Sequence, residues 1–108
     1  MANTFLRHTS NAVGTTPAVV YTVGSGVTAS VVIGGVLSNT TTGTVKVEVT
    51  VTSGSTVINL TGENTVIPAA SALSFVDGKI VLQTGDIIKV TSDTATSVDV
   101  HLSVMEID

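Results

Sequence analysis

The sequence predicts an all-β protein, folded as an antiparallel two-sheet β-sandwich of the jelly-roll kind with about eight short strands. Composition is the first indication, because 46 of the 108 residues are Val, Ile or Thr. Their branched Cβ atoms restrict χ1 in helices and pack well on a pleated sheet. Apolar and polar side chains also alternate with a period of two. Turn-forming residues separate the alternating segments at intervals of about 8 to 12 residues, which is typical of a sandwich.

The clearest alternation lies in two long segments, 45–52 and 98–107. In each, one face is apolar and the other polar, so one face is expected to be buried and the other wet. Met105 and Ile107 then fall on the polar side, which indicates either a bulge or an outer face that becomes covered near the strand end. The residues expected in the core are Val45, Val47, Val49, Val51, Val98, Val100, Leu102 and Val104.

Six shorter strands are expected between turn residues. Asp77-Gly78 is the sharpest turn signal, because Asp-Gly favours a type I′ hairpin between the strands on either side. No segment shows helical spacing with a cap; residues 67–72 form either one helical turn starting at Pro68 or, as we favour, an extended crossover. The six strands are expected at 18–23, 29–37, 55–60, 73–76, 80–83 and 87–91.

The whole chain, 1–108, is expected to be a single domain, since its length matches one sandwich. Residues 1–16 contain few periodic apolar positions. They form either an N-terminal arm that docks on a neighbouring subunit or, in the alternative, a first strand at 4–9.

Charge excludes several classes of partner. The net charge is −4, and the basic residues are only Arg7, Lys46, Lys79 and Lys89. A nucleic-acid site needs clustered cations with stacking aromatics, and a membrane patch needs a polybasic cluster, so neither partner is expected.

The charged fraction of 11 % is less than half the roughly 25 % usual for soluble domains. Weakly charged sheet surfaces and edges tend to associate. We therefore expect a homo-oligomer, with a trimer favoured.

Cysteine is absent, which removes disulfides, thiolate metal sites and a Cys nucleophile together. The amino terminus lacks the basic start and apolar run of a secretory signal. A cytoplasmic protein, or one packed into a particle there, is therefore expected.

The most suggestive catalytic pattern is Asp99-Val-His101-Leu-Ser103, which places an acid, an imidazole and a hydroxyl on one strand face. Same-face neighbours lie about 6.5 to 7 Å apart on a strand, so Asp99 could reach His101. A straight strand, however, gives Ser103 neither an exposed elbow nor an oxyanion hole. We interpret the three residues as a solvent-facing polar row and expect no enzymatic activity.

Metal ligation is not expected either. The two histidines, His8 and His101, lie at opposite ends of the chain and could meet only if the end strands pair. Asp77, Asp86 and Asp93 all occupy turn signals, but their spacing matches no known calcium loop. Turn formation is the favoured role of each. The sequence therefore assigns no catalytic, cofactor-binding or metal-binding residue.

The glycine pairs Gly24/Gly26 and Gly34/Gly35 are not phosphate cradles. Neither lies between a strand and a helix start with a following Lys. They are expected to serve turns, bulges or close approaches of the backbone.

Four stretches, taken in order, cover most of the chain and resemble a group of small structural proteins of tailed bacteriophages, including cyanophages. They begin at Ala18 (AVVYTV), Leu37 (LSNTTTGTVKVEV), Asp77 (DGKIVLQTGDIIKVTS) and Ser97 (SVDVHLSVMEI). The resemblance implies a non-enzymatic virion protein assembled in the host cytoplasm, most specifically a capsid decoration or cement protein. Its partner would be the major capsid protein or another virion protein, bound at capsid subunit junctions.

Two alternatives stay open. A tail, neck or fibre component would have the same composition. A carbohydrate-binding module is more distant, because sugar platforms need exposed aromatic rings. This chain has only Phe5, Tyr21 and Phe75.

Overall fold

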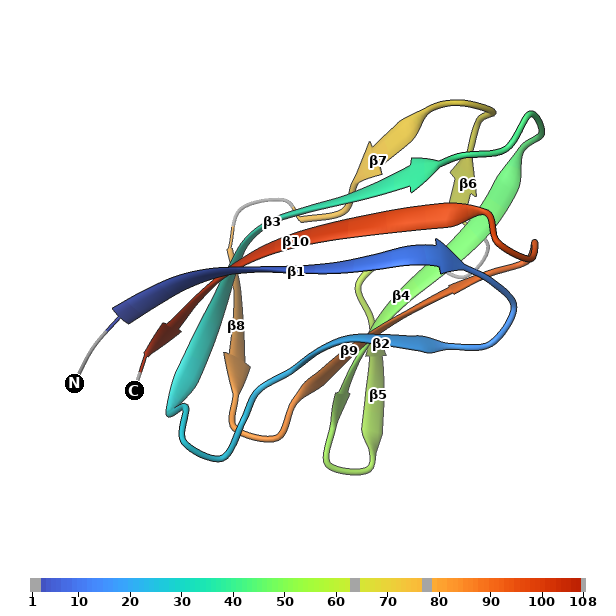
Figure 1. The fold of residues 1–108 in the computed structure, drawn as a ribbon. Helices are drawn as coiled ribbons and strands as arrows, with labels where there is room; N and C mark the ends of the chain where they lie inside the picture. Colours follow the sequence, from blue (N-terminus) through green and yellow to red (C-terminus); the bar gives the residue numbers. More distant parts are fainter. Residues whose placement is uncertain (1–2, 63–64, 77–78, 108) are drawn as a thin grey trace.

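The computed structural model describes residues 3–62, 65–76 and 79–107, and in them the chain forms strands and no helix (Figure 1). No helix of the described part is therefore long and apolar enough to cross a membrane. The strands are β1 (Asn3–Val13), β2 (Ala18–Thr22), β3 (Ala29–Asn39), β4 (Val45–Ser53), β5 (Thr56–Asn59), β6 (Thr65–Ile67), β7 (Ala72–Ser74), β8 (Ile80–Gln83), β9 (Ile87–Ser92) and β10 (Val98–Ile107).

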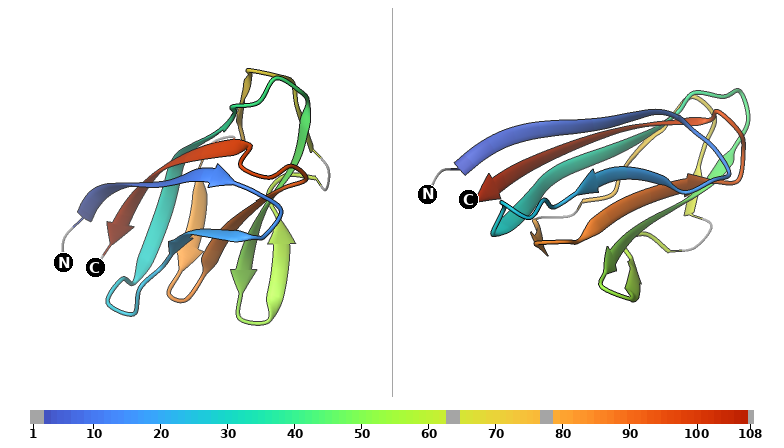
Figure 2. Two further views of the ribbon diagram at one scale, coloured as in Figure 1. Left: turned by 45° about the vertical axis from the view of Figure 1, so that its right-hand side comes forward. Right: turned by 60° about the horizontal axis from the view of Figure 1, so that its bottom comes forward.

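The strands form two antiparallel sheets that lie face to face (Figure 2). Sheet A has the order β1-β10-β3, with β7 and β8 both paired to the far side of β3. Sheet B has the order β2-β9-β4, with β5 and β6 both paired to the far side of β4. The first strand thus pairs with the last and the second with the last but one. This nesting is typical of a jelly roll, and the predicted fold class is confirmed.

Ten strands occupy eight positions, four in each sheet. β7 and β8 lie end to end along β3, opposite residues 36–38 and 29–32. β5 and β6 do the same along β4. The expectation of about eight strands therefore matches the positions, while two positions are each split into two short strands.

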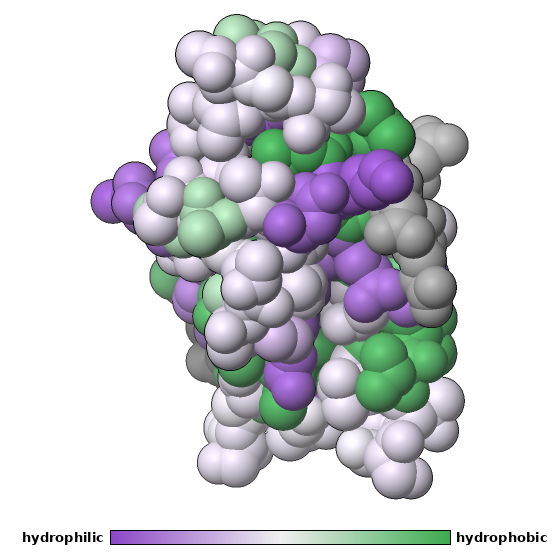
Figure 3. Space-filling model, turned by 90° about the vertical axis from the view of Figure 1, so that its right-hand side faces the viewer, coloured by the Kyte–Doolittle hydropathy of each residue, from purple (hydrophilic) through white to green (hydrophobic). Residues whose placement is uncertain are grey.

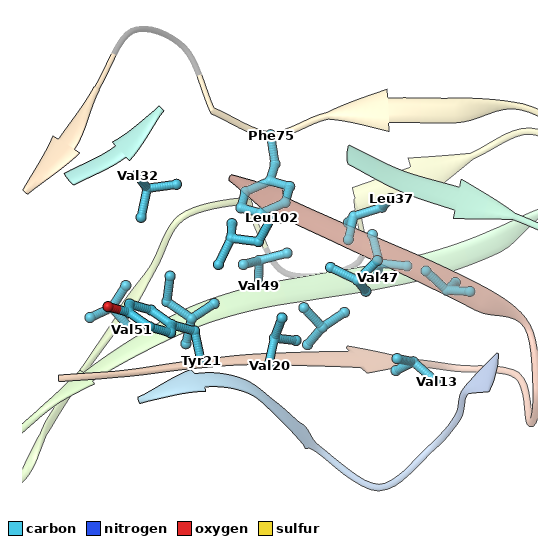
Figure 4. Close-up of a cluster of buried hydrophobic side chains, with 14 of the residues drawn as sticks. Val13, Val20, Tyr21, Val32, Leu37, Val47, Val49, Val51, Phe75 and Leu102 are labelled. Carbon is cyan, nitrogen blue, oxygen red and sulfur yellow. The ribbon is translucent and has the colours of Figure 1, made fainter. Parts of the chain in front are cut away.

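Side chains that alternate along the strands fill the space between the sheets (Figure 4). All eight residues expected in the core are at most 6 % exposed. They meet Val32 and Leu37 of β3, Ile88 and Val90 of β9, and the ring of Phe75. The predicted register of β4 and β10 is therefore confirmed, since a one-residue slip would turn the whole set outward.

The predicted hairpin around Asp77-Gly78 is wrong in its pairing. Those two residues lie outside the described residues, but the strands on either side, β7 and β8, both pair with β3 instead of with each other. Between them Phe75 turns inward and is 9 % exposed. Because this ring is buried in the core, the chain continues along β3 and does not fold back on itself.

Residues 67–72 form a crossover, as favoured, which carries the chain from β6 in sheet B to β7 in sheet A, but the segment is not extended. A tight turn lies there, in which Ser71 N donates to Pro68 O and Ala70 takes a φ of 55°. The strand Thr65–Ile67 before it was not predicted, because three residues are too few to show alternation.

The expected irregularity near Met105 lies on the neighbouring strand. The register of β10 against β3 shifts between Ser103 and Val104, where β3 carries the extra residue Ile33. β10 itself alternates regularly to its end. Met105 therefore lies on the outer face of sheet A, the face turned away from sheet B, and Glu106 points inward.

The N-terminal segment forms β1 along β10, from Asn3 opposite Ile107 to Val13 opposite Val98. Of the two alternatives, the first strand is therefore the one observed, and it spans residues 3–13 where 4–9 was predicted. Both chain termini consequently lie at the same end of the sandwich (Figure 1). Docking of this segment on a neighbouring subunit stays a prediction.

Candidate interaction surface

The row Asp99, His101 and Ser103 lies on the outer face of sheet A and does not form a triad. Asp99 Oδ1 accepts a hydrogen bond from Ala12 N, 3.0 Å away, and His101 is exposed. Ala12 has a φ of 57° at the register shift of β1, a conformation that disfavours residues with a Cβ. Asp99 therefore holds the β1 bulge, a structural role that the alternation pattern did not reveal.

The two histidines lie on opposite faces of sheet A, although the end strands do pair. His8 is opposite Leu102, so its ring points inward, and His101 is opposite Thr9 and points outward. Among the described residues, no three His, Asp or Glu side chains converge on one point.

Asp86 and Asp93 stand at the two ends of β9 and each accepts a backbone hydrogen bond. Asp86 Oδ2 binds Gln83 N in a turn where Gly85 has a φ of 92°. Asp93 Oδ1 binds Lys46 N, and this hydrogen bond lowers the pKa of the Asp93 carboxyl. Asp86 closes a turn, as expected, whereas Asp93 binds the segment after β9 to the start of β4. Asp77 lies outside the described residues.

Gly35 is a close-approach glycine. A Cβ added there would lie 2.5 Å from Cζ of Phe75, whereas one added at the neighbouring Gly34 would meet nothing within 4 Å. Only glycine lets the Phe75 ring lie against β3. Residues 24 to 26 belong to a turn in which Val27 N donates to Gly24 O.

A buried polar cluster links the two sheets at the end where the chain termini lie. Tyr21 of β2 is 2 % exposed, and its hydroxyl donates to Glu106 Oε2 of β10 over 2.6 Å. The Tyr21 hydroxyl oxygen is also 2.9 Å from Oγ of the fully buried Ser30. Burial and the bond to the Glu106 carboxylate together raise the pKa of Tyr21 to about 12.

His8 completes this cluster from β1. Its ring centroid is 4.5 Å from that of Tyr21, with the planes tilted by 45°. His8 Nε2 is buried without a hydrogen-bond partner among the described residues. The cluster positions β1 and β2 against each other.

The feature with the clearest bearing on function is an apolar row across the outer face of sheet A. Phe5 is opposite Met105, Met105 is opposite Val31, and Val31 is opposite Val81. The row therefore crosses β1, β10, β3 and β8 in one line. Phe5 is 70 % exposed and Val81 66 %, with Met105 and Val31 half-buried between them. Ile33, 43 % exposed, adds to it on β3.

Few charged side chains accompany this row. The whole chain has twelve charged residues, and on β1 Arg7 is the only one. The molecule's end at the right of Figure 1 is covered largely by side chains of intermediate hydropathy, among which lie both strongly hydrophilic and strongly hydrophobic groups (Figure 3). Apolar side chains are also exposed on sheet B, where Val57, Ile58 and Val66 are 51 to 60 % exposed. The apolar row is distinguished by crossing four strands in one line.

A sugar-binding platform is not formed by the three aromatic residues. Tyr21 and Phe75 are buried in the core, and only Phe5 is exposed. A carbohydrate module of the stacking kind needs several exposed rings on one face.

No protein-family model matches the chain. A search of curated proteins also finds no match. Among solved structures, the chain is similar to one described as "Bacillus endospore appendages form a novel family of disulfide-linked pili". The TM-score is 0.58 at 16 % sequence identity, covering 98 % of this chain and 87 % of that one. At this identity the likeness shows a shared fold.

Proposed function

We propose that this chain is a non-enzymatic structural subunit, which packs in many copies against other protein in a large assembly. The apolar row from Phe5 to Val81 carries the proposal. Exposed apolar side chains in a line across four strands mark a protein interaction site, because water contact with such a patch is unfavourable.

The most specific form of the proposal is a capsid decoration or cement protein of a tailed phage, located in the virion. The resemblance of the four sequence stretches to phage structural proteins supports it. The partner would be the major capsid protein or another virion protein. A flat, weakly charged sheet face suits such contacts, since burying it leaves few ions without water.

A subunit of an extracellular appendage is the second candidate, and the structural neighbour supports it. That neighbour belongs to pili described as disulfide-linked. This chain has no cysteine, so it could not form comparable disulfide links, and we propose non-covalent contacts in their place. A tail or fibre component of a phage would use the same contacts.

The experiment compares the parent protein with Phe5→Ser/Val81→Ser, which makes both ends of the row polar. The matched control is Val57→Ser, since Val57 is 60 % exposed on β5 of the other sheet. Light scattering measures self-association, and co-sedimentation with capsids stripped of this protein measures decoration. Electron microscopy of the concentrated protein detects filaments.

We expect the parent and the control to associate, either with themselves or with capsids. The double variant should show weaker self-association or weaker capsid binding than the parent. A parent protein that stays monomeric, binds no capsid and forms no filament would overturn the proposal. So would a double variant that associates as the parent does.

A further inference from the structure

We infer that two copies of the chain pair through the free edge of β1, antiparallel, with Leu6 opposite Leu6 of the second copy. The inference rests on the proposed self-assembly and identifies the strand through which two copies would bind each other. It does not depend on whether the assembly is a capsid or an appendage.

β1 is the longest free edge of the sandwich. It spans 11 residues and, in the described part of the chain, pairs with β10 on one side only. Half of its backbone N–H and C=O groups therefore point away from the sheet. The other edges are formed by β2, of five residues, and by split strands of at most four.

β1 also lacks most of the features that normally prevent pairing at an edge. Such edges are usually short or carry Lys, Pro or inward-pointing charges. β1 contains no Lys and no Pro, and its register against β10 is regular from Asn3 to Ser10. The bulge comes only after Ser10. A partner strand can therefore pair along residues 3–10.

Geometry limits the register of such a pair. Opposed residues of an antiparallel pair point to the same face, so outward-facing residues must oppose outward-facing ones. In a two-fold symmetric pair, one residue must therefore lie directly opposite the same residue of the second copy, and this residue marks the centre of the pairing. Centres at Leu6 and at Arg7 each pair seven residues of the regular segment, and other centres pair fewer.

Charge selects between these two centres. A centre at Arg7 places the two Arg7 guanidinium groups opposite each other, which is unfavourable. A centre at Leu6 places Arg7 opposite Phe5 of the second copy, so that each guanidinium lies beside an aromatic ring. Leu6, 37 % exposed in the single chain, would then be covered by its counterpart.

The contact also brings the apolar rows of the two copies close together, offset by two residues, because Phe5 lies diagonal to Phe5 of the second copy. Phe5 is the end of the row at the sheet edge, so pairing brings the rows of the two copies to either side of the two-fold axis. The closed unit is a dimer, which replaces the trimer favoured from composition. A head-to-tail contact of β1 with β8 would instead build rings or filaments, but β8 offers only four residues.

The absence of cysteine permits a direct test by single-cysteine variants. Opposed Cα atoms lie about 4.5 to 5.5 Å apart, within the range for a disulfide, whereas diagonal neighbours lie at about 7 to 8 Å. We expect Leu6→Cys to oxidise to a covalent dimer. Phe5→Cys and Arg7→Cys should not, because each lies two residues from its own counterpart. Val57→Cys on β5 is the control for random collision.

In the paired dimer the two thiols react as one molecule, so Leu6→Cys should cross-link at least about tenfold faster than the control. Sedimentation of the parent protein runs in parallel. Faster cross-linking of Arg7→Cys or Phe5→Cys would overturn the register. A self-associating parent without cross-links at any of the three positions would overturn the β1 contact and leave the proposed function standing. A monomeric parent would overturn the contact, while capsid binding would decide the proposed function separately.

Discussion

The Tyr21 hydroxyl donates a hydrogen bond to Glu106 Oε2 over 2.6 Å, and in doing so connects β2 of sheet B to β10 of sheet A. The core around it is a cluster of apolar side chains, so this bond adds a directional contact to an interior filled mainly by packing. Because a buried phenol needs a partner, the pair also determines how β2 lies relative to the end of β10.

We predict that Tyr21 ionises near pH 12 instead of near 10.0. Tyr21 is the only tyrosine and tryptophan is absent, so near-ultraviolet absorbance of tyrosinate reports this one group. Glu106→Gln removes the negative charge and should lower the midpoint. A parent midpoint near 10 in the folded protein would contradict the burial and the bond.

The same shift predicts a change of stability with pH. The pKa of Tyr21 is higher in the folded protein than in the unfolded chain, so the unfolded chain loses its proton first. The stabilisation is therefore complete below about pH 10 and is lost as the pH rises through about 12. The difference in unfolding free energy between the parent and Tyr21→Phe should shrink over this range, as measured by urea denaturation.

The second prediction concerns the core between β4 and β10. Val49 and Leu102 are fully buried, so Val49→Ala or Leu102→Ala should each cost roughly 1 to 4 kcal/mol from lost burial and the cavity left behind. Val57→Ala, on the exposed strand β5, should change stability by less than about 0.5 kcal/mol. Urea midpoints that are equal for all three variants would contradict the packing.

The predictable part of the fold depends on local pattern. Alternation identified both long core strands, and the strand 80–83 was predicted with the bounds that the structure has. On a strand, every second side chain faces the core, so the apolar positions in a single sequence are enough to predict which residues are buried. The inward position of Glu106 could also have been found, because it continues the period of Val98 to Val104.

The rest depends on contacts between distant residues. Pairing of β7 and β8 with β3 follows from the fit of Phe75 against Gly35, which no local signal shows. Of the two alternatives predicted near Met105, a bulge on β10 is wrong, because the register shift lies on β3 and either strand of a pair can absorb such a shift. The other alternative, a partly covered outer face, agrees with the intermediate burial of Met105 and Ile107. The apolar row likewise appears only once four strands are aligned.

The third prediction tests the contact of Gly35 with Phe75. Gly35→Ala should cost about 1 to 3 kcal/mol, because the new methyl group overlaps a buried ring that cannot move freely. Gly34→Ala is the matched control and should change stability by less than about 0.5 kcal/mol, since nothing lies within 4 Å of its added Cβ. In a Phe75→Leu background the cost of Gly35→Ala should fall, and a purely additive double-mutant cycle would argue against the contact.

The fourth prediction concerns Asn39, whose side chain is 4 % exposed. Its amide nitrogen lies 2.9 to 3.1 Å from Gly43 O, Ile67 O and Pro68 O, so its two N–H groups are shared among three acceptors, while its oxygen accepts from Thr41 N. This one side chain joins the β3–β4 loop to the end of β6.

Asn39→Asp keeps the shape but replaces the donor by a carboxylate that faces three carbonyl oxygens. We expect a loss of roughly 3 kcal/mol or more at neutral pH, and less in acid, where protonation restores a donor. Asn59→Asp is the same chemical change on the exposed strand β5 and should be nearly neutral. Denaturation curves of equal midpoint for Asn39→Asp and the parent would disprove the bonding.

The fifth prediction separates Asp99 from His101 and Ser103. Asp99→Ala removes the acceptor for Ala12 N and should cost about 0.5 to 1.5 kcal/mol, whereas Asp99→Asn keeps an oxygen in place and should cost less. His101→Ala and Ser103→Ala should be close to the parent, since neither is needed to hold the bulge. In the Asp99→Ala background, Ala12→Gly should recover part of the loss, because glycine adopts the φ of 57° without steric strain. Equal stability of all these variants would contradict the structural role of Asp99. Loss of a measurable hydrolytic activity in any of them would show that Asp99, His101 and Ser103 form a catalytic site after all.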